Sequence, residues 1–152
     1  SFLQQDGTVW TTDKDGIILG LLAVEMVSTT GKTPAQHYVD MTEQWGTPVF
    51  QRVDMPCTEE IKSALKGMKP SDVTMTKLGG SPILDIRTTS LFEEQPIDGV
   101  KIVTDTGWFV ARPSGTENLY KMYAESYLGE EGLAQLMEDG KRIIEGLVTK
   151  SA

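Results

Sequence analysis

Cysteine, histidine and basic residues are scarce in this 152-residue sequence. Cys57 is its single cysteine, so no disulfide can form within the chain, and this count fits a reducing, intracellular location. Only 14 Lys and Arg residues stand against 22 Asp and Glu residues, which gives a net charge of −8. Because nucleic acid requires a basic protein face, we expect no nucleic-acid partner. An anionic ligand would need a local cluster of donors, since the overall charge does not attract it.

Long apolar runs are also missing, which excludes a helix that spans a bilayer. The longest run, residues 17–27, is interrupted by Gly20 and Glu25 and follows polar and charged residues rather than a basic leader. We therefore expect neither a membrane partner nor a signal peptide. The sequence begins at Ser1 rather than at a methionine, which indicates a processed or truncated chain.

The first third of the sequence reads as two helices. Thr12 and Asp15 have the spacing of a capping box, and the apolar residues after them predict a largely buried helix over residues 13–30. Thr33 and Gln36 form a second capping box, with proline at the first position of a helix that ends at a glycine. We expect no sheet in this part of the sequence, and two helices alone cannot cover so much apolar surface.

The rest of the sequence changes from a helical to an alternating period near residues 46–48. The predicted strands are residues 49–54, 83–88, 100–104, 108–111 and 119–127, and the predicted helices are residues 58–68 and 130–148. This order predicts an α+β fold in which an antiparallel sheet is packed by two helices. We place a domain boundary at residues 46–48 and interpret the two preceding helices as part of a domain whose strands are left out.

The segment with the most chemistry lies between the last two predicted strands and reads Arg-Pro-Ser-Gly-Thr-Glu. Arg112 offers a planar fork of donors that matches two phosphate oxygens. Ser114 and Thr116 add hydroxyl donors, and Gly115 allows backbone N–H groups to approach an anion. Lys121, on the following strand, adds a positive charge. On spacing alone, the segment fits either a phosphate site or an ordinary polar hairpin turn.

A family resemblance decides between these two. The sequence Trp-Phe-Val-Ala-Arg-Pro-Ser-Gly-Thr-Glu at residues 108–117, continued by Leu-Tyr-Lys-Met-Tyr-Ala-Glu-Ser at residues 119–126, resembles the last domain of the bacterial phosphoglucomutases, in the α-D-phosphohexomutase superfamily. Asp-Gly-Thr, Trp and Thr-Asp-Lys-Asp-Gly within residues 6–16 resemble the segment just after that family's third-domain sugar-binding loop. The resemblance covers nearly the whole chain.

The resemblance implies a domain for each part of the chain. Residues 47–152 correspond to the family's fourth domain, whose antiparallel sheet packed by two helices has a TATA-binding-protein-like arrangement. Residues 1–46 correspond to the C-terminal helices of the third domain, an α/β domain that is truncated here.

The implied activity is that of a four-domain cytoplasmic enzyme, which moves a phosphoryl group between O1 and O6 of glucose phosphate. A phosphoserine, Mg²⁺ and a glucose 1,6-bisphosphate intermediate take part in the whole enzyme, and the fourth domain holds the phosphate that is not reacting. By position, the implied phosphate-binding residues are Arg112, Ser114, Gly115, Thr116 and Lys121. The implied partners are a phosphosugar and the remaining domains of the same enzyme.

The family motifs that perform the chemistry are absent from this sequence. It contains no Ser-His-Asn motif around a catalytic serine, no Asp-Gly-Asp metal loop and no Glu-Glu-Ser sugar loop. We therefore expect this fragment to have no mutase activity alone, to bind no metal and to hold no cofactor of its own.

Lys14 is a further candidate. It is predicted in the first turn of the first helix, where the helix dipole disfavours a positive charge by about 0.3–1 kcal/mol. In the family that the chain resembles, a lysine here faces the active site and assists proton transfer or contacts the ligand. A solvated surface lysine is the alternative.

Two other interpretations stay open. The first keeps the superfamily but changes the sugar to mannose or glucosamine phosphate, because the residues that select the sugar are not in this chain. The second is a non-catalytic module that binds a phosphosugar. The apolar first helix argues against such a module, because an independent domain should not begin with a helix that exposes Ile17, Leu21 and Leu22.

Overall fold

The computed structural model describes residues 2–11, 15–91 and 95–151. The chain divides into two compact units, Ser1–Gly46 (unit 1) and Thr47–Ala152 (unit 2). Unit 1 consists of β1 (Phe2–Leu3), β2 (Val9–Trp10), α1 (Gly16–Thr30) and α2 (Pro34–Trp45). β1 and β2, two residues each, pair antiparallel, so the expectation that this part contains no sheet is wrong.

α1 begins at Gly16, three residues after the predicted start. The Asp15 carboxylate accepts hydrogen bonds from the N–H groups of Ile17 (3.0 Å) and Ile18 (3.1 Å), so Asp15 is the N-cap. The prediction of a buried helix is wrong for this chain: no described α1 side chain is buried, and Ile17 is 78% exposed. The two-residue pair of unit 1 offers no sheet surface wide enough to cover an apolar helix.

α2 follows its prediction closely. The Thr33 hydroxyl accepts a hydrogen bond from the Gln36 N–H, and the Gln36 side chain accepts one from the Thr33 N–H at 2.8 Å. This reciprocal capping box fixes the start of the helix. Proline has no N–H group, but the N–H at the first helical position would have no partner within the helix, so no hydrogen bond is lost.

Unit 2 contains a six-stranded antiparallel sheet with the strand order β3-β8-β7-β6-β5-β4. Its elements are β3 (Val49–Pro56), α3 (Glu59–Lys66), the 3-10 turn η1 (Pro70–Asp72), β4 (Lys77–Leu78), β5 (Ser81–Thr89), β6 (Pro96–Thr104), β7 (Gly107–Pro113), β8 (Leu119–Ser126) and α4 (Gly129–Ser151). The predicted α+β fold, with an antiparallel sheet packed by two helices, is confirmed. The short β4 and η1 were not predicted.

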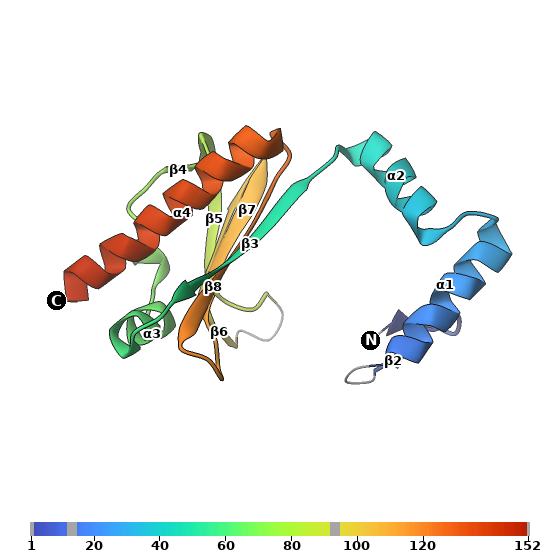
Figure 1. Cartoon of the computed structure of the whole chain (residues 1–152), viewed down its shortest axis with the longest axis horizontal. Coiled ribbons are helices and arrows are strands. Elements are labelled where there is room, and N and C mark those ends of the chain that lie inside the picture. The colour runs from blue at the N-terminus through green and yellow to red at the C-terminus, as the bar shows by residue number, and fades with distance from the viewer. Residues whose placement is uncertain (1, 12–14, 92–94, 152) are drawn as a thin grey trace. The chain divides into compact units, whose positions relative to one another are not determined.

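α3 and α4 lie on one side of this sheet (Figure 1). Alternate residues of β7 and β8, such as Phe109, Ala111 and Met122, point toward the helices and are buried, together with Leu136 and Ile144 of α4. The intervening residues of these strands face away from α3 and α4. We call this second surface the outer face; it comprises Phe50, Arg52, Asp54, Trp108, Val110, Arg112, Lys121, Tyr123 and Glu125.

α4 passes very close to β7. A Cβ atom added at Gly140 would lie 2.3 Å from a ring carbon of Phe109, whose side chain is fully buried. Nearby, the Asp139 carboxylate accepts a hydrogen bond from the Gly79 N–H at 2.9 Å, which ties α4 to the turn between β4 and β5. The close packing at Gly140 and the hydrogen bond of Asp139 therefore fix the distance between α4 and the sheet.

We expect unit 2 to fold without unit 1. Every buried apolar side chain that the structure describes, and the whole six-stranded sheet, belong to unit 2, so removal of residues 1–46 should leave this core intact. The 47–152 piece should unfold in one cooperative step, with a midpoint close to that of the same transition in the intact chain. Thermal unfolding and amide NMR spectra of both chains test this, and a piece without dispersed amide signals would refute the boundary at residues 46–47.

Candidate functional site

The predicted phosphate-binding residues lie on the hairpin of β7 and β8. Arg112 and Lys121 are direct cross-strand partners on the outer face, and Asp54 of β3 is the partner of Lys121 on its other side. The Ser114 N–H donates to the Leu119 carbonyl at 2.8 Å and closes the connection between the strands. The sheet therefore holds the arginine and the lysine side by side at the base of this turn.

Ser114 is nearly buried, with 7% of its surface exposed, whereas Gly115 and Thr116 are exposed. A Cβ atom added at Gly115 would meet nothing within 4 Å, and its φ lies outside the left-handed region. Glycine at this position thus leaves open space beside the turn rather than permitting a special backbone conformation.

Glu117 contacts two of the predicted ligands. Its Oε2 atom accepts a hydrogen bond from Ser114 Oγ at 3.4 Å and lies 3.6 Å from Lys121 Nζ. The Glu117 side chain is 57% exposed, and that of Lys121 is 20% exposed. The structure therefore brings Ser114, Lys121 and a carboxylate together.

Arg112 is exposed and forms no ion pair with any carboxylate among the described residues. Gly99 on β6 makes room beside it. A Cβ atom added at Gly99 would lie 2.9 Å from Arg112 Cβ and 2.1 Å from the Ala111 carbonyl oxygen. No sequence pattern indicates this role of Gly99, because the role depends on the pairing of β6 with β7.

Arg52 and Asp54 of β3 are two charged neighbours of the site that sequence reasoning missed. Arg52 Nε donates to one carboxylate oxygen of Asp54 at 2.7 Å, and its Nη2 donates to the other at 2.6 Å. This hydrogen bonding lowers the pKa of Asp54 below its ordinary value, and the charge of Lys121 lowers it further. The guanidinium carbon of Arg52 lies 5.8 Å from the centre of the Tyr123 ring. The alternation of apolar and polar residues predicts β3 as a strand. However, only the pairing of β3 with β8 places these two charged residues beside Lys121.

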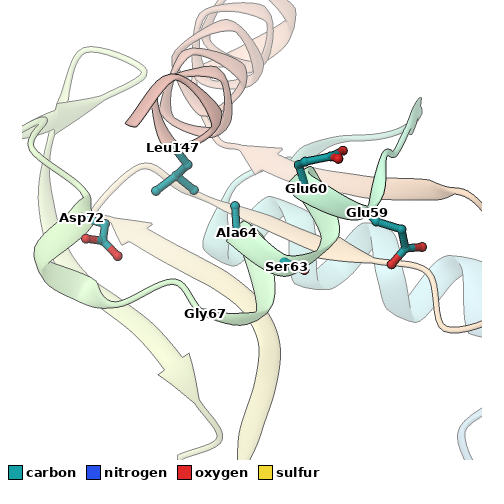
Figure 2. A pocket seen from close by; sticks show the side chains of 7 residues that line it. All are labelled: Glu59, Glu60, Ser63, Ala64, Gly67, Asp72 and Leu147. Carbon is teal, nitrogen blue, oxygen red and sulfur yellow. The ribbon is translucent and has the colours of Figure 1, made fainter. Parts of the chain in front are cut away.

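A cavity of about 630 Å³ lies between α3, the 3-10 turn and α4 (Figure 2). Its apolar walls include Ala64 and Leu147, and its carboxylates belong to Glu59, Glu60 and Asp72. These carboxylates point in different directions, and none of the predicted phosphate ligands lines the cavity. Three acidic side chains repel a phosphate, so this cavity is not the predicted anion site.

Three further expectations concern Lys14, the membrane and a metal. Lys14 lies outside the described residues, and the helix that was predicted to contain it begins at Gly16. Within residues 2–11, 15–91 and 95–151, no helix is both long and apolar enough to cross a membrane. In the same part of the chain, no three or more His, Cys, Asp or Glu side chains are grouped as metal ligands.

Comparison with known proteins gives consistent matches. The family described as "Phosphoglucomutase/phosphomannomutase, C-terminal domain" matches residues 56–143. A phosphoglucomutase of Komagataeibacter xylinus is 47% identical over 152 residues, which is 100% of this chain and 27% of that protein. A probable phosphoglucosamine mutase of Pyrococcus abyssi is 28% identical over 143 residues, or 94% of this chain and 28% of that protein.

A solved structure shares the fold. It is a phosphoglucomutase/phosphomannomutase family protein from Burkholderia thailandensis, with a TM-score of 0.58 and 16% identity, and the match covers 91% of this chain and 25% of that one. The chain therefore spans about a quarter of the length of these relatives.

Proposed function

Because this chain belongs to the phosphoglucomutase/phosphomannomutase family and contains its C-terminal domain, we propose that unit 2 holds the substrate phosphate in a phosphoglucomutase. The observation that carries this proposal is the placement of Arg112, Ser114 and Lys121 on one hairpin beside open space. Unit 1 is proposed as the end of the preceding domain. The complete enzyme would interconvert glucose 1-phosphate and glucose 6-phosphate in the cytoplasm.

The proposed role of the hairpin is to position the substrate. Arg112 would bind two oxygens of the phosphate that is not reacting, while the Ser114 hydroxyl and the Lys121 ammonium would bind the third. Binding energy from this distant end of the substrate orients the end that reacts. The bisphosphate intermediate must turn round between the two half-reactions, and a grip that recognises phosphate rather than sugar accepts both orientations. Thr116 and the backbone of Gly115 are proposed to complete the grip.

The chemical step itself is assigned to other domains. The phosphoserine and Mg²⁺ would lie in parts of the enzyme that this chain does not contain. Lys14, if it reaches the active site, would contact the ligand or assist proton transfer there. The upstream reading frame should encode a Ser-His-Asn motif and an Asp-Gly-Asp loop, and their absence would count against the proposal.

Glucose is the favoured sugar because identity to the phosphoglucomutase is 47%, against 28% to the phosphoglucosamine mutase. A phosphomannose or phosphoglucosamine substrate remains the second candidate. Activity of the full-length enzyme on the three sugar phosphates distinguishes them, and the ratio of kcat/KM values should favour glucose phosphate.

We expect glucose 1,6-bisphosphate to shift the amide signals of residues 114–117 in NMR spectra of this chain. The dissociation constant should be in the millimolar range, because unit 2 supplies contacts to only one end of the ligand. Inorganic phosphate should shift the same amides, and glucose should shift none of them. Unchanged amides at millimolar bisphosphate would show that the hairpin is not a phosphate site.

A further inference from the structure

Glu117 lies where a ligand of the hairpin is expected. One oxygen of its carboxylate, Oε2, is 3.4 Å from Ser114 Oγ and 3.6 Å from Lys121 Nζ. These two groups are donors that the proposed function assigns to the phosphate. A single carboxylate oxygen therefore faces a hydroxyl and an ammonium in the way that a phosphate oxygen would.

The hold on Glu117 is weak. Charge-assisted hydrogen bonds are usually about 2.7–2.9 Å long, and both contacts of Glu117 are longer than this. Its side chain is 57% exposed, and exposed ion pairs contribute little to stability. By contrast, the ion pair between Arg52 and Asp54 on the same face has contacts of 2.6 and 2.7 Å. Glu117 can thus leave its two partners at small cost.

Arg112 differs from the other two donors. It forms no ion pair with a carboxylate in the part of the chain that the structure describes, whereas Ser114 and Lys121 are both engaged by Glu117. An incoming phosphate can therefore meet the Arg112 guanidinium first. Its remaining oxygens can then replace the carboxylate at the serine and the lysine.

We propose that Glu117 is an internal competitor for the phosphate: its carboxylate occupies Ser114 and Lys121 in the free protein and is displaced by a phosphate monoester dianion. This inference rests on the proposed function, since it assumes that both residues bind phosphate. It also gives the acidic residue a role in turnover. A grip on the bisphosphate intermediate must open before the intermediate can turn round, and a carboxylate that reoccupies the two donors lowers the cost of opening.

The test is to titrate the 152-residue chain with inorganic phosphate and with glucose 1,6-bisphosphate, comparing wild type with Glu117→Gln. The amide keeps the size of the side chain and a hydrogen-bond acceptor but loses the charge. We expect the dissociation constant to fall by about threefold to tenfold, because a competing ion pair and a like charge are both removed. The gain should shrink as ionic strength rises. Glu117→Ala should show a gain of similar size.

Glu130→Gln is the matched control. Glu130 is an exposed carboxylate in the first turn of α4, which follows the end of β8 that is distant from the turn at residues 114–118. Glu130→Gln changes the net charge by the same amount as Glu117→Gln does. An equal gain in affinity in Glu130→Gln would therefore mean that only the overall charge matters, and it would overturn the proposal. Unchanged or weaker binding by Glu117→Gln, with native amide signals for β8, would also overturn it.

Arg112→Gln separates this inference from the proposed function. If this variant binds phosphate as well as wild type does, or if wild type binds none, the proposed function fails and the inference falls with it. If Arg112→Gln loses binding while Glu117→Gln does not gain it, the phosphate site stands and Glu117 is not its competitor. Loss of binding in the first variant and a gain in the second support both.

Discussion

Arg112→Gln is expected to weaken the binding of glucose 1,6-bisphosphate to this chain by about 10- to 100-fold. Hydrogen bonds to charged groups are the strong ones, and Arg112 would supply two of them in a fixed fork. The arginine is exposed on the outer face, so its loss should leave the fold and its stability nearly unchanged. The change in affinity is measured by calorimetry or by the amide shifts of residues 114–117.

Two further variants show whether geometry or charge is responsible. Arg112→Lys keeps the charge but loses the fork, and it should recover only part of the lost affinity. Arg142→Gln removes an arginine of α4 whose side chain is 60% exposed, and it should bind as wild type does. Binding by Arg112→Gln within about twofold of wild type would contradict the assignment of this residue.

Gly140→Ala is expected to lower the free energy of unfolding of unit 2 by about 1–3 kcal/mol. The added methyl group would lie 2.3 Å from the Phe109 ring, so the helix or the ring must move. Gly146→Ala is the matched control in the same helix, because a Cβ atom there meets nothing within 4 Å. It should stabilise the protein by about 0.5–1 kcal/mol, since alanine favours the helix more than glycine does.

Denaturant unfolding of both variants and wild type measures this difference. The double variant Phe109→Leu/Gly140→Ala should lose less stability than the two single variants lose when their losses are added. The smaller leucine side chain removes the ring atoms with which the new methyl group collides. Equal shifts for the two glycine variants would mean that α4 does not pack on β7 as closely as described.

The sequence predicts those helix ends that depend on contacts between residues close together in the chain. Thr33 and Gln36 specify the start of α2 because both partners of the capping box lie within one turn. The predicted start of α1 is wrong, because the capping-box spacing made Thr12 the N-cap and Asp15 only its partner three residues later. The structure uses Asp15, whose carboxylate accepts from Ile17 and Ile18.

Register could not be predicted in the same way. The motif identified Arg112 and Lys121, which are nine positions apart in the sequence, but the position of Asp54 beside Lys121 depends on how β3 pairs with β8. Gly99 is similar, because its role follows from the approach of β6 to β7. Such contacts join distant segments, and no short sequence pattern specifies them.

The apolar pattern of α1 predicted burial, and the described helix has no buried residue. A hydrophobic pattern indicates which face of a segment can be buried, but it does not show which element of the protein covers that face. The described strands of unit 1, β1 and β2, are two residues long, so their sheet is too small to bury the apolar side chains of α1.

The order of elements along the chain also has a consequence for synthesis. Arg112 and Lys121 leave the ribosome before α4, the helix that covers the back of their strands. Until that helix emerges, Phe109 and Ala111 face water, and the hairpin lacks the layer that holds its shape. The nascent chain should therefore carry every residue of the candidate site for some time before it can bind a ligand.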